Sequence, residues 1–345
     1  MRVKPLRVGV VGSAFGGNVH VPSFRAQERF EVVAIASPSR AADVARERKI
    51  PHAFGSVREM LDGVELDVVS VASPPFDHRD SVLAALERGK HVLCEKPFGL
   101  DVAQAEEMLA ASERAGTVCA LAHEFRYTSS RQAMKELIDN GHLGPLRELE
   151  GTVLMSFLTA GNERAPSWWF EEKRGGGITG AILSHVIDQS NWLAGRAPVH
   201  AVGFGRTANP VRRYKGETFS SDVADGAFAL LDYGDGLIAR LAVDATHPVD
   251  STTLAVHGET RVAAASGPDV LNMTMFVVDA EETSELALRP QKHAELAAVH
   301  PYLPAFVTLL DEFAAAIDGK PAQLPTFADG LATQRVLEAA GYGRR

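Results

Sequence analysis

The sequence predicts an α/β protein whose N-terminal part is a doubly wound parallel sheet and whose C-terminal part is an α+β domain with an open, largely antiparallel sheet. Between residues 6 and 122, short apolar runs alternate with helix-length segments, which is typical of βαβ units with right-handed crossovers. Beyond residue 146, longer stretches alternate polar and apolar residues, as strands with one solvated face do. A chain of 345 residues is long enough for about two domains.

Four apolar runs predict the strands of the first part: 6–11, 30–36, 66–72 and 91–94. Helix-like sequence such as SVLAALERG separates them, as parallel pairing requires. A helix over 101–115, stopped by Gly116, and the strand TVCALA follow. We place the domain crossover in the next segment, HEFRY, and therefore expect domains over 1–125 and 126–345.

The second part is expected to contain strands in RELEGTVLMSF, DGAFALLDY, GLIARLAVDA and TTLAVHGE. The segment YGDG between two of them predicts a hairpin, because glycine tolerates the positive φ of such turns. PAFVTLLDEFAAAIDG and DGLATQRVLEAAG are predicted to be amphipathic helices.

Composition narrows the class of protein. A formal charge of -9 provides no overall positive field for a polyphosphate backbone, so a nucleic-acid partner is not expected. The N-terminal segment enters a strand without a signal-peptide pattern, and no apolar span suits a membrane, so we expect a cytoplasmic protein. Cys94 and Cys119 lie in apolar runs without metal-ligand spacing, which favours buried reduced thiols and no metal site.

A glycine-rich turn, Gly12-Ser13-Ala14-Phe15-Gly16-Gly17, follows the first predicted strand. Such a turn lets backbone N–H groups approach a pyrophosphate at a helix N-terminus, which is the Rossmann mode of dinucleotide binding. Gly12 and Gly17 match the first and third glycines of that fingerprint, whereas Ala14 replaces the second. The alternative is a turn without a ligand, but its position in a βαβ chain favours the dinucleotide.

The end of the second strand bears on the choice of dinucleotide. Ser37 stands where an NAD-preferring fold usually has a carboxylate for the ribose 2′-hydroxyl, and Arg40 is available to pair with a 2′-phosphate. We therefore expect NADP, with NAD as the alternative. The alternative to a phosphate contact is that Arg40 is simply a solvated residue at the start of the next helix.

Two further motifs carry polar groups. Glu95-Lys96-Pro97 follows the strand at 91–94, at the sheet edge where open α/β sheets bind ligands. If burial and a neighbouring charge lower its pKa, Lys96 can exchange a proton with a substrate hydroxyl.

After a glycine triplet at 175–177, helical spacing would align Ala181, His185 and Asp188 on one helix face. His185 is then a candidate to orient a hydroxyl, with Asp188 as its anchor or as a structural residue.

These motifs together resemble the glucose-fructose oxidoreductase and inositol dehydrogenase family, called Gfo/Idh/MocA. The resemblance covers nearly the whole chain. It includes the glycine turn followed by His20, the stretch VVSVASPPFDHRDSVLAALERGKHVLCEKPFGLDVAQAEEML, and GGGITGAILSHVIDQSNWLAG.

The resemblance implies a Rossmann domain over 1–125 and a domain over 126–345 for substrate binding and oligomerisation, as a homodimer or homotetramer. It implies Lys96 and His185 as the catalytic residues. The cofactor would be bound by Gly12, Ala14, Phe15, Gly16, Gly17, Ser37, Arg40, Ser73, Pro74, His78, Glu95 and Lys96. The substrate, a sugar, cyclitol or related polyol, would meet Lys96, Arg126, Trp168, Trp169 and His185.

The chain also departs from these relatives. Those with an inositol-dehydrogenase-like site carry D-x-x-x-H in the second-domain helix, but Ala181 occupies the aspartate position here, and Leu183 replaces a glycine. The substrate therefore does not transfer by analogy. Trp168 and Trp169 either wall the substrate site or pack in the core, and Arg126 with Tyr127 either lines the cleft or pins the two domains together.

The expected reaction is hydride transfer between nicotinamide and a carbinol or carbonyl carbon, with Lys96 as acid or base. Loss of the aspartate at Ala181 leaves two alternatives open. One is a dinucleotide-binding sensor or co-regulator without turnover. The other is a redox-neutral lyase or glycosidase that oxidises and then re-reduces its sugar with bound cofactor.

Overall fold

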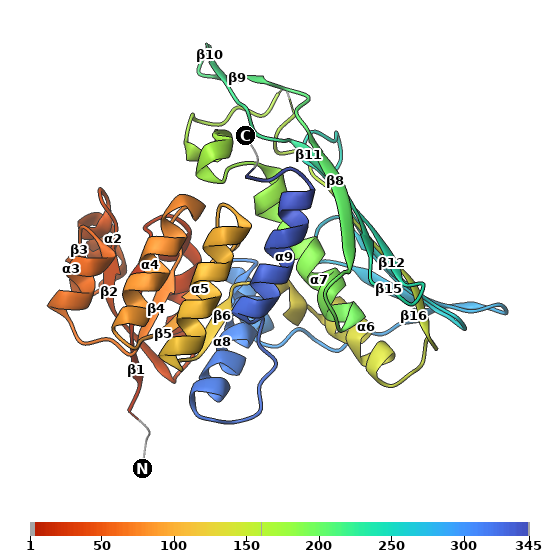
Figure 1. Ribbon diagram of the computed structural model, residues 1–345, viewed down its shortest axis with the longest axis horizontal. Coiled ribbons are helices and arrows are strands. Elements are labelled where there is room, and N and C mark those ends of the chain that lie inside the picture. Colours follow the sequence, from red (N-terminus) through yellow and green to blue (C-terminus); the bar gives the residue numbers. More distant parts are fainter. Residues whose placement is uncertain (1–3, 160, 344–345) are drawn as a thin grey trace. The chain divides into compact units, whose positions relative to one another are not determined.

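The computed structural model describes residues 4–159 and 161–343, and the chain forms two compact units (Figure 1). The first comprises the N-terminal segment up to Glu124 together with Lys292–Leu331. The second comprises Phe125–Gln291 and the residues from Ala332 onward. The crossover after Glu124 lies one residue from the boundary that the sequence suggested, but the return of the C-terminal segment to the first unit was not anticipated.

The first unit contains a six-stranded parallel sheet in the order β3-β2-β1-β4-β5-β6. Its strands are β1 (Leu6–Val11), β2 (Phe30–Ala36), β3 (His52–Phe54), β4 (Val68–Val71), β5 (His91–Cys94) and β6 (Cys119–Leu121). The predicted doubly wound sheet is confirmed. The three-residue β3 was missed because its sequence, HAF, is too short to show a period. The chain reverses its direction of winding between β1 and β4, which is where such sheets bind ligands.

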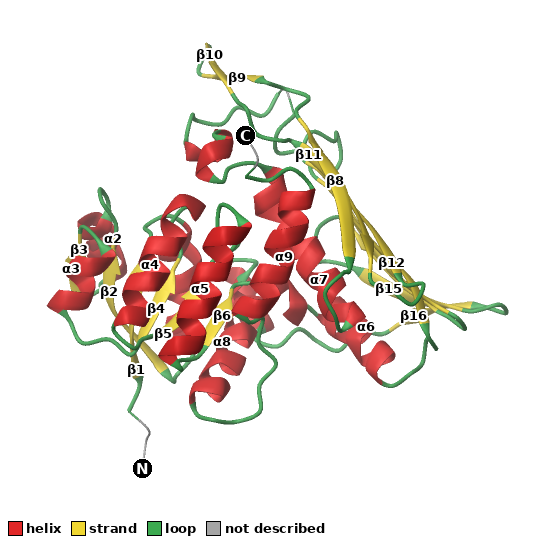
Figure 2. Cartoon of the chain, in the orientation of Figure 1, coloured by secondary structure: helices red, strands yellow, loops and turns green. Residues whose placement is uncertain are grey.

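Helices cover the sheet of this unit (Figure 2). They are α1 (Val21–Ala26), α2 (Ala41–Arg48), α3 (Val57–Gly63), α4 (Pro75–Glu87), α5 (Val102–Ala115) and α8 (Leu303–Ile317). The predicted helix at 101–115 is confirmed as α5, except that Asp101 is its N-cap: its side chain accepts a hydrogen bond from the Gln104 backbone, and Gly116 adopts the left-handed conformation that ends the helix.

The C-terminal segment joins this unit through apolar and backbone contacts. Phe306 and Phe313 of α8 pack against the rings of His20 and Phe30, respectively. The Leu121 backbone N–H donates to the carbonyl of Pro325. Such pairings join segments more than 200 residues apart and leave no local signal, since each segment alone shows only an apolar helix face or a short strand.

The second unit contains an eight-stranded sheet in the order β16-β15-β14-β13-β7-β12-β11-β8. Its strands are β7 (Leu146–Leu154), β8 (His200–Arg206), β11 (Gly226–Asp232), β12 (Ile238–Asp244), β13 (Ser251–Gly258), β14 (Val262–Gly267), β15 (Thr274–Val278) and β16 (Thr283–Leu286). All neighbours are antiparallel except β7 and β12. The open, largely antiparallel sheet is therefore confirmed, and so is the YGDG hairpin, where Asp232 pairs with Ile238.

Two longer helices, α6 (Ser129–Asp139) and α7 (Ser184–Ala194), pack against this sheet. A separate hairpin is formed by β9 (Val211–Tyr214) and β10 (Glu217–Ser220), whose turn uses positive φ at Lys215 and Gly216. The last helix, α9 (Phe327–Ala339), lies where the second C-terminal helix was predicted, but it is buried over most of its surface, including polar Thr333 and Gln334, and is not clearly amphipathic. Within the described parts of the chain, every helix is too short or too polar to cross a lipid bilayer.

Candidate functional site

In the turn after β1, glycines leave the backbone uncovered by side chains. Gly12 has a φ of 107°, and a Cβ atom added there would lie 2.3 Å from the carbonyl oxygen of Ala72. A side chain is therefore excluded both by the backbone conformation and by the segment that follows β4. A Cβ atom added at Gly17 would lie 3.0 Å from a methyl of Val44 in α2. These close approaches are the roles that the first and third glycines play in a dinucleotide-binding turn.

Ala14 fits this turn without strain. Its side chain is exposed, and its φ is not positive, so a methyl group replaces the middle glycine at no backbone cost. Phe15 lies half-buried with its ring edge-on to His20, 5.6 Å between centroids. A π-helical turn, Gly16–His20, then leads into α1. The substitution at Ala14 therefore leaves the shape of the turn intact.

Ser37 and Arg40 lie beside the glycine turn, after β2. The Ser37 hydroxyl donates to the hydroxyl of Ser13 at 3.1 Å, which joins the end of β2 to the turn. Arg40 precedes α2 and is exposed. Among the described residues, no carboxylate forms an ion pair with its guanidinium.

His78 joins two neighbouring loops of the sheet edge. Its side chain is wholly buried, with Nε2 2.8 Å from the carbonyl oxygen of Ser73 and Nδ1 3.0 Å from that of Pro97. Burial lowers its pKa, against the opposing effect of those carbonyls and of Glu95. The imidazole thus bridges the segments that follow β4 and β5.

Ser73 differs from His78 in having an unused polar atom. Its hydroxyl oxygen is buried, and no hydrogen-bond partner lies within reach in residues 4–159 and 161–343. A buried hydroxyl without a partner is uncommon, and a bound ligand or water is the usual explanation. Pro74, the next residue, caps the start of α4 and is half-buried.

Glu95 belongs to a buried network that reasoning from sequence missed. Its Oε1 lies 3.0 Å from Nε2 of His20, whose Nδ1 lies 2.7 Å from the hydroxyl of Ser70. Its Oε2 accepts the backbone N–H of Lys96 at 3.2 Å. Burial alone would raise the pKa of Glu95, but the hydrogen bond and charge of His20, with Lys96 and His78, hold it below its ordinary value. Glu95 is therefore an internal support for the chain segment that carries Lys96.

Lys96 is half-buried directly after β5, and its peptide bond to Pro97 is cis. Gly12, Ser37 and Ser73 follow β1, β2 and β4 within two residues. Because these strands are parallel, all four residues lie at the carboxyl edge of one sheet. The glycine turn offers backbone N–H groups and Ser73 offers a side-chain hydroxyl at this edge, and both fit the contacts that a dinucleotide requires.

In the second unit, His185 lies in the first turn of α7 and is buried. The ring of Phe125 stacks on it, with centroids 4.0 Å apart and planes 21° from parallel. The guanidinium carbon of Arg131 lies 5.5 Å from the Phe125 centroid. Arg131 is itself buried and donates to Gln189 at 2.6 Å. Phe125 and Arg131 received no role from sequence, although the HEFRY segment placed Phe125 beside a candidate arginine.

Arg126 and Asp188 form a buried bidentate ion pair, at 2.7 and 2.5 Å. The Arg126 guanidinium also lies 5.9 Å from the ring centroid of Trp192. Asp188 is thus a partner of Arg126. The pair ties the start of the second unit to α7.

Trp168 and Trp169 form a helical turn with Phe170 before the glycine triplet. Trp169 packs edge-on against Phe157 and Phe170, with centroids 5.6 and 5.4 Å away. A Cβ atom at Gly176 would lie 2.2 Å from the carbonyl oxygen of Trp169. Both indoles are half-buried, so they combine packing with a partly open face.

The helix that carries His185 begins irregularly. A π-helical turn, Thr179–Leu183, precedes α7 and contains Ala181. The prediction that Ala181, His185 and Asp188 share one face assumed a regular α-helix. The wider π-helical turn changes the angle between Ala181 and His185 around the helix axis. Leu183 is fully buried and therefore serves packing.

The two cysteines are free, and the described residues contain no cluster of metal ligands. Cys94 and Cys119 are free thiols, Cys94 buried and Cys119 partly so, and burial raises the pKa of both. In residues 4–159 and 161–343, no three His, Cys, Asp or Glu side chains gather in the manner of a metal site.

Several known proteins resemble this chain. An uncharacterized oxidoreductase of Synechocystis sp. is 32% identical over 194 residues, which cover 56% of this chain and 52% of that protein. Levoglucosan dehydrogenase of Pseudarthrobacter phenanthrenivorans is 28% identical over 73% of this chain and 71% of its own. A 1,5-anhydro-D-fructose reductase of Ensifer adhaerens is 29% identical over 91% and 90%, respectively.

Structural similarity extends over the whole chain. The solved complex of levoglucosan dehydrogenase with NADH and L-sorbose has a TM-score of 0.84 and covers 98% of this chain and 96% of that one, at 23% identity. The model of the oxidoreductase family with an NAD-binding Rossmann fold matches residues 6–123, and that of the GFO/IDH/MocA C-terminal domain matches residues 131–263. The chain therefore belongs to the Gfo/Idh/MocA family of oxidoreductases, with an N-terminal NAD-binding Rossmann domain.

Proposed function

We propose that this protein is a nicotinamide-dependent dehydrogenase or reductase acting on a carbinol or carbonyl carbon of a sugar, cyclitol or related polyol. The observation that carries the proposal is the common sheet edge of the bare glycine turn, the unpartnered Ser73 hydroxyl and Lys96. Relatives named as dehydrogenases and reductases of sugars support the substrate class. A bound dinucleotide supplies the hydride or accepts it.

Lys96 is the proposed acid or base. When an alcohol is oxidised, the Nζ of Lys96 takes the hydroxyl proton, and when a carbonyl is reduced, it returns that proton. The Glu95 carboxylate does not touch the substrate in this proposal. It accepts the Lys96 backbone N–H and so positions the lysine.

His185 is the second proposed catalytic residue. It orients the substrate hydroxyl or relays its proton, with its ring plane held by Phe125. Trp168, Trp169 and Arg126 complete the proposed substrate contacts. The buried pairing of Arg126 with Asp188 supports a positioning role for that arginine, because its charge is already neutralised.

We infer a preference for NADP over NAD. The residue after β2 is Ser37, which would not repel a 2′-phosphate, and the exposed Arg40 has no ion-pair partner among the described residues. Arg40→Ala should raise the KM for NADPH about tenfold while leaving that for NADH nearly unchanged. Equal effects on the two cofactors would contradict this preference.

A homodimer or homotetramer is proposed through the second sheet. Val202 and Phe204 of edge strand β8 lie beside Leu230 and Phe228 of β11, and all four side chains are exposed. Such a contiguous apolar face is typical of an interface between protein chains. Light scattering of the protein and of a Phe204→Asp variant tests this: the variant should dissociate.

The central test is turnover of NADPH and NADH on a panel of sugars, cyclitols and their keto derivatives, with the Lys96→Met variant in parallel. The variant should lose about a thousandfold in turnover while retaining its affinity for cofactor in a fluorescence titration. Normal turnover by Lys96→Met would remove the assignment. Cofactor binding without net turnover would favour the sensor or the redox-neutral enzyme that the alanine at position 181 leaves open.

A further inference from the structure

A pocket of about 330 Å³ lies in the second unit, beside the β9–β10 hairpin. Its walls come from the segment after β7, with Asn162 and Arg164, and from the chain at β9, with Asn209, Arg212 and Arg213. Phe170 contributes an apolar surface. This volume lies at the lower end of the range for small-molecule sites, roughly 300–1,000 Å³. It is large enough for a compact ligand of monosaccharide size.

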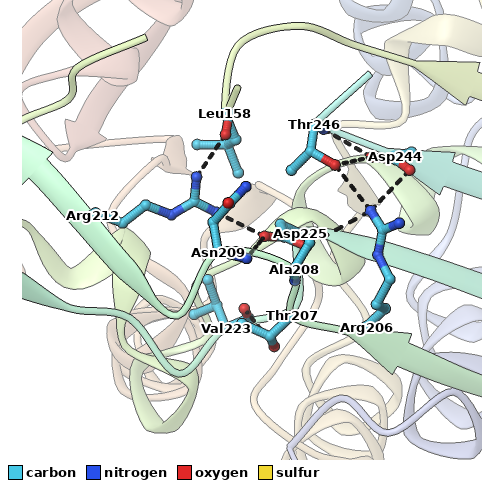
Figure 3. Close-up of polar contacts among 10 residues, drawn as sticks. All are labelled: Leu158, Arg206, Thr207, Ala208, Asn209, Arg212, Val223, Asp225, Asp244 and Thr246. Atoms are coloured by element: carbon cyan, nitrogen blue, oxygen red, sulfur yellow. Dashed lines mark hydrogen bonds and ion pairs between the residues drawn. The ribbon is translucent and has the colours of Figure 1, made fainter. Parts of the chain in front are cut away.

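A buried ion pair holds the two walls together (Figure 3). The Asp225 carboxylate, which is fully buried, accepts the Arg212 guanidinium at 2.9 Å and the backbone N–H groups of Ala208 and Asn209 at 2.8 and 2.9 Å. Arg212 also donates to the carbonyl oxygen of Leu158 at 2.6 Å. Asp225 therefore offsets the charge of Arg212 and also lies 3.8 Å from the guanidinium of Arg206, so that Arg212 serves to join the two walls of the pocket.

The other two arginines of the pocket are not neutralised. Among the described residues, neither Arg164 nor Arg213 has a carboxylate partner. Arg164 is held by aromatic faces, with its guanidinium carbon 5.1 Å from the Phe157 centroid and 5.8 Å from that of Trp169. The nearest acidic residue in sequence, Glu163, accepts the backbone N–H of Lys215.

Arg212 contributes one more unsatisfied donor. Its side chain is more than nine-tenths buried, and its Nε has no hydrogen-bond partner in the described part of the chain. A buried N–H group without a protein acceptor is uncommon, and a bound acceptor or water is the usual explanation. Arg164 and Arg213 are both exposed, so their guanidinium groups can reach an anionic group of a ligand, whereas they would repel a metal cation.

We propose that this pocket binds the oxyanion group of a small acid, either a carboxylate or a phosphate, with Arg164 and Arg213 as its charged contacts. Arg212 and Asp225 act as positioning residues that join the walls. The amides of Asn162 and Asn209 offer hydrogen bonds to a polar body, and Phe170 packs against its apolar face. The proposal does not depend on the proposed redox function.

Titration calorimetry of the full chain at low ionic strength tests this with two probes, inorganic phosphate and D-glucuronate. The variants are Arg164→Gln and Arg213→Gln, and the control is Arg147→Gln, which removes an exposed arginine paired with Glu259 outside the pocket. Each pocket variant should weaken binding about tenfold, since one charge-assisted contact is lost. Far-UV circular dichroism and the Tm establish that each variant is folded.

Weaker phosphate binding in both pocket variants, but not in the control, supports a phosphate ligand, and the same pattern with glucuronate supports a carboxylate. Affinity should also fall as salt is raised, because exposed charges are screened. Phosphate that binds equally well to all variants occupies another place, such as the glycine turn, and counts against the proposal. Absence of binding by both probes overturns it.

Discussion

Two π-helical turns in the described part of the chain lead to histidines that are held in different ways. Gly16–His20 and Thr179–Leu183 each follow a glycine-rich stretch and precede a helix. Both nitrogens of His20 lie within hydrogen-bond distance of polar side chains, Ser70 and Glu95. The ring of His185 is stacked against that of Phe125.

In our proposal, this difference separates a supporting histidine from a catalytic one. Hydrogen bonds at both nitrogens commit the His20 ring to its neighbours, so it serves to keep Glu95 ionised and in place. A stacked ring is restrained in orientation without the stack consuming a ring nitrogen. The same kind of π-helical turn therefore precedes a structural histidine in one case and, in our proposal, a catalytic histidine in the other.

The largest expected effect is on stability, from His20→Ala. Loss of the imidazole leaves the Glu95 carboxylate buried without its main partner, which should cost about 3 kcal/mol of unfolding free energy. Urea denaturation measures this, with the exposed His52→Ala as a matched control. If His20→Ala changed the free energy of unfolding as little as the control does, His20 would not be a structural support for Glu95.

His185→Asn should have the opposite profile. We expect a loss of about a hundredfold in kcat, with an unfolding free energy that changes much less than in His20→Ala. Steady-state kinetics and urea denaturation of the same preparations provide the two readouts, and the exposed His200→Asn is the control. Unchanged kcat in His185→Asn would show that this residue has no catalytic role.

Phe125→Leu should have a smaller effect, because only the aromatic stack on His185 is lost. A stack of this kind contributes about 1 kcal/mol, so kcat should fall about fivefold and the pH profile of kcat should shift. Phe76→Leu, at a partly exposed phenylalanine in the first unit, is the control. An unaltered pH profile would mean that Phe125 only fills space.

The smallest expected effect is the pH dependence of stability from Glu95. Its pKa is lowered on folding from an ordinary value of 4.5, so the folded state favours the ionised carboxylate. The resulting stability is present above pH 4.5 and is lost as the pH falls through the lowered pKa. Thermal unfolding between pH 7 and pH 3 should therefore show a steeper loss for the wild type than for Glu95→Gln. Parallel curves would contradict the ionised state of Glu95.

The sequence by itself determined the features that are encoded locally. The apolar runs at 6–11, 30–36 and 91–94 became strands with those limits. Gly12 could be singled out because a positive φ and a close backbone approach demand glycine. Lys96 could be placed at the carboxyl edge because it follows a strand of a parallel sheet.

Only the tertiary structure decided which side chains meet. His20 and Glu95 are 75 residues apart, and Arg126 and Asp188 are 62 apart. Neither periodicity nor propensity reports such a pairing, because both depend on windows of about 11–18 residues. His78 and Glu95 are buried and lie within hydrogen-bond distance of groups in other segments of the chain, and their contact with a cofactor stays a prediction. The roles of these polar groups follow from desolvation and the partners that compensate it, and both exist only once the chain has folded.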